Sequence, residues 1–366
     1  ELANCQHKLP YSGNKRIDYF IPKTLDVGDT TLLIAYDTEV EYNGNTYDRN
    51  SPGLKTNESD WKYIPGFTIK GGANYNLNER MNIFMNLGYL SKAQRFNNVL
   101  DYDNKFILGI KNEKVKAVEL GYSYEVSRLV LNVNAYYTIW ENKPTDRNFT
   151  FPDPDDPTNR LTANINNMNA LHKGIEIEFG FMITDNLEFQ SILSLGDWKW
   201  TSKDTALIYN DNNILIGKKP FDARGLYVGD AAQFQNRESL RWEVIRGLYV
   251  SGDFTWFGKH YAEFNPIDFD PEMNPWAFDE NGDPKQSWKI PNYYMVDFHA
   301  GYSWKYEKLG FQLRGSVLNA LNGRYITDAQ NNDTYLGMAS SNFDVNSASV
   351  FMGMGRRFVV SLRINL

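Results

Sequence analysis

Hydrophobic and polar residues alternate one by one along much of the chain, and a period of two is typical of β-strands with two unlike faces. One face of the last nine residues carries Phe358, Val360, Leu362, Ile364 and Leu366, and the other carries Val359, Ser361, Arg363 and Asn365. The same sorting recurs in segments 81–89, 129–137, 175–181 and 296–305. No long window has a helical period, so the sequence predicts an all-β protein built from antiparallel strands.

Short polar segments join these strands in pairs and predict tight hairpin turns. They are segments 76–80, 125–128, 183–186, 245–247 and 307–308. The midpoints of successive turns are 48 to 61 residues apart, and the last turn lies at a similar distance from the end of the sequence. One strand before the first turn and two in each of five intervals predict eleven strands, and residues 31–42 offer a weaker twelfth.

The connections between one hairpin and the next are long and rich in Asn, Asp, Gly and Pro. They include segments 142–159, 203–232, 264–291 and 322–355. Short turns on one side and long loops on the other are typical of outer-membrane barrels, whereas sandwiches spread loop lengths more evenly. Residues 1–60 show little strand-like alternation. We therefore expect a weakly defined loop and strand region there and a transmembrane β-barrel wall over 61–366.

Aromatic residues make up 15% of the chain and gather near predicted strand ends, as at Trp198 and Trp200 or Trp256 and Phe257. Such clusters predict girdles at the two membrane interfaces. The polar strand faces carry Glu176, Glu178, Asp253, Asp297, Arg314 and Arg363. A wet barrel lumen accepts these charges and a closed sandwich core does not. A large soluble β-protein is the alternative that alternation alone leaves open.

Several classes of protein do not fit the sequence. Its longest apolar run, at 32–36, is far shorter than the roughly 20 residues of a transmembrane helix. The net charge is −7 without a Lys/Arg block, which argues against nucleic acid as a partner. The single Cys5 cannot form an internal disulfide, and the four histidines are isolated. We therefore expect neither enzymatic activity nor a cofactor.

The long loops hold the candidate binding residues. Trp276, Phe278 and Trp288 are candidates to cover a ligand, with local packing of the loop as the alternative. Asp268, Asp270, Asp279 and Asp283 are weak calcium candidates, because carboxylates spaced along a loop suit that ion. The late glutamate of an EF-hand loop is missing, and a solvated surface loop is the alternative.

Several different short motifs follow one another along the chain. They are GGANYNL at 71–77, NLGY at 86–89, ELGY at 119–122, NAYYT at 134–138, HKGIEIE at 172–178, VLNALN at 317–322 and the final strand from 356. In this order, residues 60–366 resemble the C-terminal barrel of TonB-dependent receptors, especially those of Bacteroidetes-type bacteria. One departure is the final residue, which is Leu366 where the family usually has Phe.

The resemblance implies an outer-membrane barrel of about 22 strands, plugged by an N-terminal domain. We expect this sequence to supply about half of those strands and to hold no plug domain. The implied partners are the lipid bilayer, the protein's own N-terminal half and plug, TonB through a segment outside this sequence, and a surface lipoprotein. The implied function is active import of a bulky, scarce nutrient such as an iron–siderophore complex, cobalamin or a glycan. A passive pore and a barrel anchor for a surface adhesin or complex are the alternatives.

Overall fold

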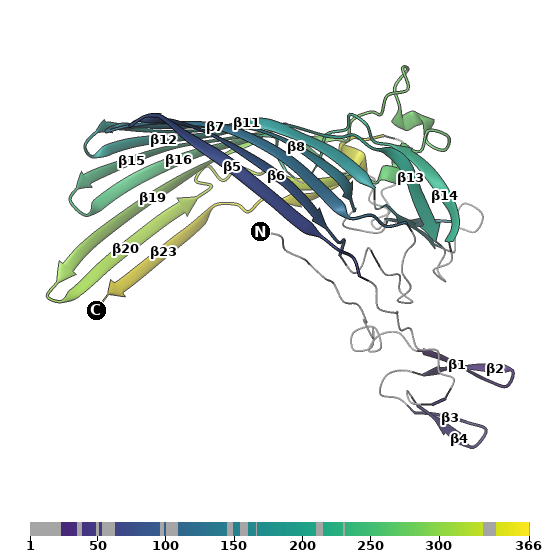
Figure 1. The fold of residues 1–366 in the computed structure, drawn as a ribbon. Helices are drawn as coiled ribbons and strands as arrows, with labels where there is room; N and C mark the ends of the chain where they lie inside the picture. The colour runs from purple at the N-terminus through teal and green to yellow at the C-terminus, as the bar shows by residue number, and fades with distance from the viewer. Residues whose placement is uncertain are drawn as a thin grey trace.

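The computed structural model describes residues 23–34, 39–48, 51–52, 63–95, 99, 109–144, 149–153, 160–165, 167–209, 215–229, 231–331 and 342–365. One antiparallel sheet of eleven strands dominates these residues and curves into an arch (Figure 1). The all-β prediction is therefore confirmed, and the sheet has the eleven strands counted from the sequence. The total of about 22 in a complete barrel stays a prediction.

Each strand of the large sheet pairs with its neighbours in chain order, which makes the sheet a continuous meander. Its strands are β5 (Phe67–Asn78), β6 (Met81–Lys92), β7 (Glu113–Val126), β8 (Leu129–Lys143), β11 (Met168–Thr184), β12 (Leu187–Trp200), β15 (Phe234–Ile245), β16 (Leu248–Gly258), β19 (Tyr293–Tyr306), β20 (Leu309–Leu318) and β23 (Arg357–Asn365). β5 and β23 are its two edges and do not pair with each other.

The five predicted turns are confirmed as two-residue links within the hairpins β5–β6, β7–β8, β11–β12, β15–β16 and β19–β20. Because these links join alternate pairs of an antiparallel meander, they all lie at the same rim (Figure 1). Gly247 shows why the turn residue matters. Its φ is +86°, and a Cβ there would lie 2.5 Å from the Ser303 carbonyl oxygen.

The opposite rim carries the long connections, which the structure shows to hold strands of their own. β9 (Phe149–Pro152), β10 (Arg160–Asn164), β13 (Lys203–Tyr209) and β14 (Leu215–Asp222) form a four-stranded sheet. Two small hairpins pair β17 (His260–Tyr261) with β18 (Lys289–Ile290), and β21 (Ile326–Asn331) with β22 (Ala348–Met352). The 3-10 helices η2 (Pro266–Phe269), η3 (Pro275–Ala277) and η5 (Val345–Ser347) complete this side.

The suggested twelfth strand at 31–42 is not part of the large sheet. Its described residues fall in two separate hairpins, β1 (Lys23–Val27) with β2 (Thr30–Ile34), and β3 (Val40–Tyr42) with β4 (Asn45–Tyr47). Leu25, Leu32 and Ile34 form a small core of their own there. Alternation alone misplaced this segment, because a period of two identifies a strand without identifying its partner.

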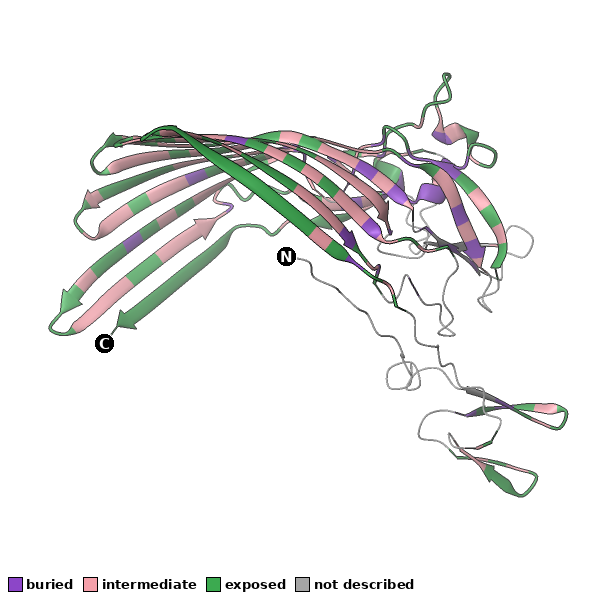
Figure 2. Ribbon diagram, viewed as in Figure 1, coloured by how far each residue is buried: buried purple, intermediate pink, exposed green. Residues whose placement is uncertain are grey.

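Buried residues are rare in the arch and frequent beside the long connections (Figure 2). The largest buried cluster joins β10, β13 and β14 to η2 and includes Ile208, Phe221 and Phe269. Among the described residues, the arch is a single layer of sheet whose side chains have no second layer to pack against. Large apolar residues such as Leu120, Phe358 and Val360 are exposed by 56%, 72% and 75% on its outer face.

Candidate functional site

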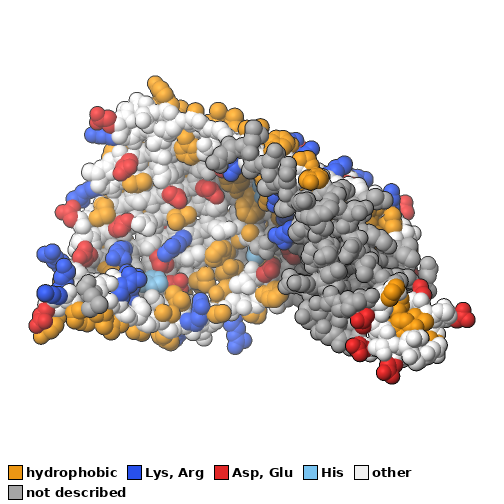
Figure 3. Space-filling view, turned by 60° about the horizontal axis from the view of Figure 1, so that its bottom comes forward, with side chains coloured by type: hydrophobic (Ala, Val, Ile, Leu, Met, Phe, Trp, Pro, Cys, Tyr) orange, Lys and Arg blue, Asp and Glu red, His pale blue; other side chains and the backbone are white. Residues whose placement is uncertain are grey.

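The hollow face of the arch carries acidic and basic side chains from many strands (Figure 3). Strand pairing puts the predicted polar residues on this face, and it puts Phe358, Val360, Leu362 and Ile364 on the outer face. One inner row runs across five strands as Asn76, Asn82, Ser123, Asn132 and Glu178. The alternation therefore produces a hydrophilic inner wall, as predicted.

Asp253 on β16 is a buried carboxylate of this wall, with 7% of its surface exposed. Its Oδ2 lies 3.1 Å from Arg237 Nη2 and 3.1 Å from His299 Nε2. His299 Nδ1 lies 2.8 Å from Ser316 Oγ, so four neighbouring strands contribute to one hydrogen-bonded cluster. These contacts fix the positions of a cation and an imidazole that face the hollow side.

A cleft on the inner wall surrounds this cluster. Its lining includes Glu188, Arg241 and Arg314 besides the Asp253 cluster. The Arg241 guanidinium lies 3.7 Å from the centre of the Tyr249 ring, which holds that side chain against the wall. The cleft thus offers guanidinium groups and a carboxylate together, which suits a charged or polar chain segment better than an apolar one.

The three aromatic candidates do not form one site. Trp276 and Phe278 pack against the large buried cluster, with the Trp276 ring 5.1 Å from Phe343 and the Phe278 ring 6.3 Å from Phe269. Trp288 packs instead against the separate cluster around Ile290. All three are half-buried in loop packing, and a ligand role for them stays a prediction.

Two of the four aspartates hold their own loops in shape. Asp270 Oδ1 accepts hydrogen bonds from the amides of Glu272 and Met273, and Asp279 Oδ1 accepts two from Asn281 and Asp283. Within the described ranges, no three His, Cys, Asp or Glu side chains lie close enough together to hold a metal ion. Calcium binding by Asp268, Asp270, Asp279 and Asp283 stays a prediction.

Asp222 at the end of β14 anchors the long-connection side through buried charge. Arg224 donates to both of its oxygens at 2.9 and 2.6 Å, and Lys203 Nζ lies 3.3 Å away. Burial opposes ionisation of this carboxyl, yet the hydrogen bonds from Arg224 and Lys203 hold its pKa below the ordinary value. Arg224 follows Asp222 by two residues, and no predicted site included this pair.

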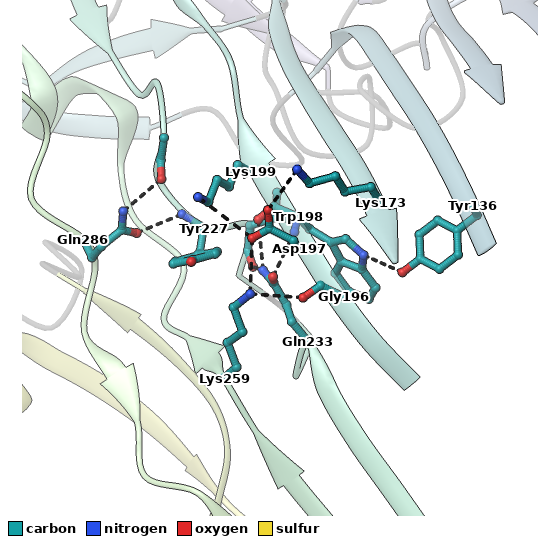
Figure 4. A network of polar contacts seen from close by, with 12 residues as sticks. Tyr136, Lys173, Gly196, Asp197, Trp198, Lys199, Tyr227, Gln233, Lys259 and Gln286 are labelled. Carbon is teal, nitrogen blue, oxygen red and sulfur yellow. Dashed lines mark hydrogen bonds and ion pairs between the residues drawn. The ribbon is translucent and has the colours of Figure 1, made fainter. Parts of the chain in front are cut away.

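Three lysines gather around one carboxylate where β11 and β12 approach the long connections (Figure 4). Asp197 lies 3.2 Å from Lys259, 3.5 Å from Lys173 and 3.9 Å from Lys199. The Lys199 and Lys259 ammonium groups also lie 4.9 and 4.7 Å from the centre of the Tyr227 ring. Lys173, Tyr227 and Lys259 are far from Asp197 in the chain, so no local pattern predicted the cluster.

The predicted aromatic girdle is divided between the two faces. Trp140 and Trp198 contact His172 on the inner face, with ring centres 5.6 and 5.3 Å away. Tyr137 and Trp256 lie on the outer face. Strand ends alone therefore do not decide which aromatic residues meet the membrane interface. Among the described residues, no helix is long and apolar enough to span a membrane.

Residues 12–320 match the family model described as "TonB dependent receptor-like, beta-barrel". No curated protein matches the chain. Among solved structures, the copper transporter OprC superposes with a TM-score of 0.51 at 13% identity, covering 91% of this chain and 43% of its own.

Two further solved structures are similar. The siderophore receptor PiuA from Acinetobacter baumannii has a TM-score of 0.52 at 15% identity, covering 87% of this chain and 38% of its own. The ferric yersiniabactin uptake receptor FyuA from Yersinia pestis has a TM-score of 0.52 at 16% identity, covering 85% and 39%. The chain therefore shares their fold and spans about two fifths of their length.

Proposed function

The chain belongs to the TonB-dependent receptor family of outer-membrane β-barrels, and on that premise we propose that it forms part of a receptor for active nutrient import. The cargo class is a bulky, scarce nutrient: an iron–siderophore complex, cobalamin or a glycan. Solved structures with this fold are named for copper, siderophore and ferric yersiniabactin transport, so metals and their complexes are the first cargo to test.

The observation that carries the proposal is the hydrophilic inner wall with its enclosed Asp253 cluster. Arg237, Asp253 and His299 brace one another, while Arg241 and Arg314 line the same cleft. In a receptor, such a wall would contact the plug and the passing cargo through charged hydrogen bonds. Fixed groups of both signs favour a specific partner more than free diffusion of small solutes.

The open sheet supports a larger barrel than these eleven strands. Lipid does not satisfy the backbone N–H and C=O groups of an edge strand, and each such group costs several kcal/mol. β5 and β23 are edges of the described sheet. We infer that further strands of the same protein join these edges, and that a plug fills the resulting wide lumen. TonB would act through an N-terminal segment of the whole protein, and a surface lipoprotein is a further partner in this proposal.

Uptake measurements in the source bacterium test the proposal. We expect deletion of the gene to abolish uptake of one labelled cargo among a ferric siderophore, cobalamin and an oligosaccharide, and a plasmid copy to restore it. A protonophore should abolish the same uptake in wild-type cells, because active import requires inner-membrane energy.

Two other outcomes contradict active import. Entry of small solutes that depends on the gene but resists the protonophore would indicate a passive pore. Loss of surface attachment with all three uptakes unchanged would indicate an adhesin anchor.

A further inference from the structure

The lysine cluster around Asp197 lies on the outer wall, facing away from the lumen. On β11 and β12, Lys173 pairs directly with Asp197, and both share their face with the apolar Ile175 and Leu195. Their inner-face neighbours are His172 and Trp198, whose rings stack on each other. The three ammonium groups therefore belong to the surface that meets the membrane, and the lumen site does not use them.

The cluster lies at a particular depth along the strands. Lys173 precedes the turn residue Asp185 by 12 residues (185 − 173). At about 3.3 Å per residue and a tilt of about 35–45°, Lys173 stands roughly 30 Å above the turns. The apolar band of such barrels is about 25 Å tall. The lysines therefore lie just beyond the band, on the side of the long connections, which faces the cell exterior.

The charges of the cluster do not cancel. Asp197 supplies one negative charge to three lysines, whose side chains are 32% to 50% exposed. Farther along the same rim, by contrast, the Lys116 ammonium is paired with Glu141 at 2.7 Å. An ammonium has three donors, so each lysine keeps hydrogen-bonding capacity for an external anion.

The lysines are also held in place before any ligand arrives. Lys259 donates to the Gly196 carbonyl oxygen at 3.1 Å and lies over the Tyr227 ring. Tyr227 stacks on Tyr261 with ring centres 4.5 Å apart. The Tyr227 amide donates to Gln286 Oε1 at 2.9 Å (Figure 4). Pre-organised cations lose less conformational entropy when they bind an anion.

We propose that Lys173, Lys199 and Lys259 form a binding site for the phosphate groups of an anionic lipid in the outer leaflet. An outward position, a depth just beyond the apolar band and an unbalanced positive charge all match a phosphorylated lipid headgroup. The proposed site requires that the receptor lies in the outer membrane, and it does not depend on which cargo the receptor imports.

The test compares two triple variants of the full-length receptor, purified from its own outer membrane. K173Q/K199Q/K259Q removes the cluster, and K289Q/K305Q/K308Q removes the same number of lysines elsewhere. Native mass spectrometry measures co-purified phosphorylated lipid. We expect the first variant to lose it by about tenfold or more and the control to keep it. Equal loss in both variants, or no loss in the first, overturns the proposal.

Two further measurements keep the result decisive. Lys259 also supports the loop that holds Tyr227, so the single variant K199E repeats the test with the contacts of Lys259 intact. Added lipid A should bind wild-type receptor, and lipid A stripped of phosphate should bind about tenfold more weakly or worse. Equal binding of both forms, or displacement by millimolar inorganic phosphate alone, contradicts a lipid headgroup site.

Discussion

Two rows of residues on the same five strands show how differently the two faces of the arch are built. The outer row is Tyr75, Ile83, Tyr122, Val133 and Ile177, and the inner row, one residue away on each strand, is Asn76, Asn82, Ser123, Asn132 and Glu178. Neither row is covered by a second layer of protein in the described structure. Each face is therefore suited to its surroundings, apolar outside and aqueous inside, and a polar change should have opposite consequences on the two faces.

The largest expected effect comes from moving one charge across the sheet. Val133 lies five residues past the Arg128 turn, near the middle of the apolar band. We expect Val133→Arg to destabilise the full-length receptor in lipid vesicles by about 2–4 kcal/mol in urea unfolding. Asn132→Arg is the matched control, because Asn132 faces the lumen beside Glu178 and should tolerate the charge. Equal losses in both variants would show that the faces are misassigned.

A second variant tests whether the hydrogen-bonded cluster on the inner wall contributes to stability. Asp253→Ala leaves Arg237 and His299 without their shared carboxylate, and we expect a loss of about 1–3 kcal/mol. Asp185→Ala is the control, since Asp185 pairs with Arg128 at the turn rim with a 91% exposed side chain. That exposed pair should contribute about 0–1 kcal/mol. If the two variants unfold at the same urea concentration, the Asp253 cluster has no special structural role.

An acidic residue on the outer face offers a gain in stability. Glu238 points outward between Phe234 and Trp242, where its Oε1 accepts from Ser191 Oγ at 3.0 Å and from Asn236 Nδ2 at 2.8 Å. We expect Glu238→Leu to stabilise the receptor in vesicles by about 1 kcal/mol, since an acidic side chain is unfavourable against lipid. Glu178→Leu on the inner face should give no such gain. A destabilised Glu238→Leu would show that this carboxyl is needed in place.

The smallest effect concerns pH and the long-connection side. The folded-state pKa of Asp222 lies below its ordinary value near 3.8, so its contribution to stability is fully present above that value. It is lost as the pH falls through the lowered pKa. We expect protease cleavage within 203–229 to increase below about pH 4 in the wild type. Asp222→Asn should be cleaved more readily at neutral pH, with a weaker dependence on pH. Identical profiles would count against this ion cluster.

The strands and turns of the wall could be predicted because their signals are local. Alternation and turn residues such as Gly247 act over a few positions, and the hairpins β5–β6 through β19–β20 follow from them. The Asp253 cluster could not be predicted, since Asp253 and His299 meet only through the register of β16 with β19. The packing of Trp276 against Phe343 likewise depends on contacts between distant connections. Segment 31–42 shows that a local pattern does not identify the pairing partner. Its alternation was strand-like, but its described residues pair in small hairpins outside the large sheet.

The meander has a consequence for how such a chain tolerates insertion and deletion. Each inner strand of the arch pairs with the preceding and the following strand of the same sheet, and the register of each hairpin is set at its short turn. Lengthening a connection at the opposite rim leaves those registers unchanged, and doubling its length costs only about 0.6 kcal/mol of loop-closure entropy. One residue inserted within a strand instead exchanges the two faces for the rest of that strand. The exterior surface can therefore diversify in evolution by changes of length, while the wall can change only by substitution.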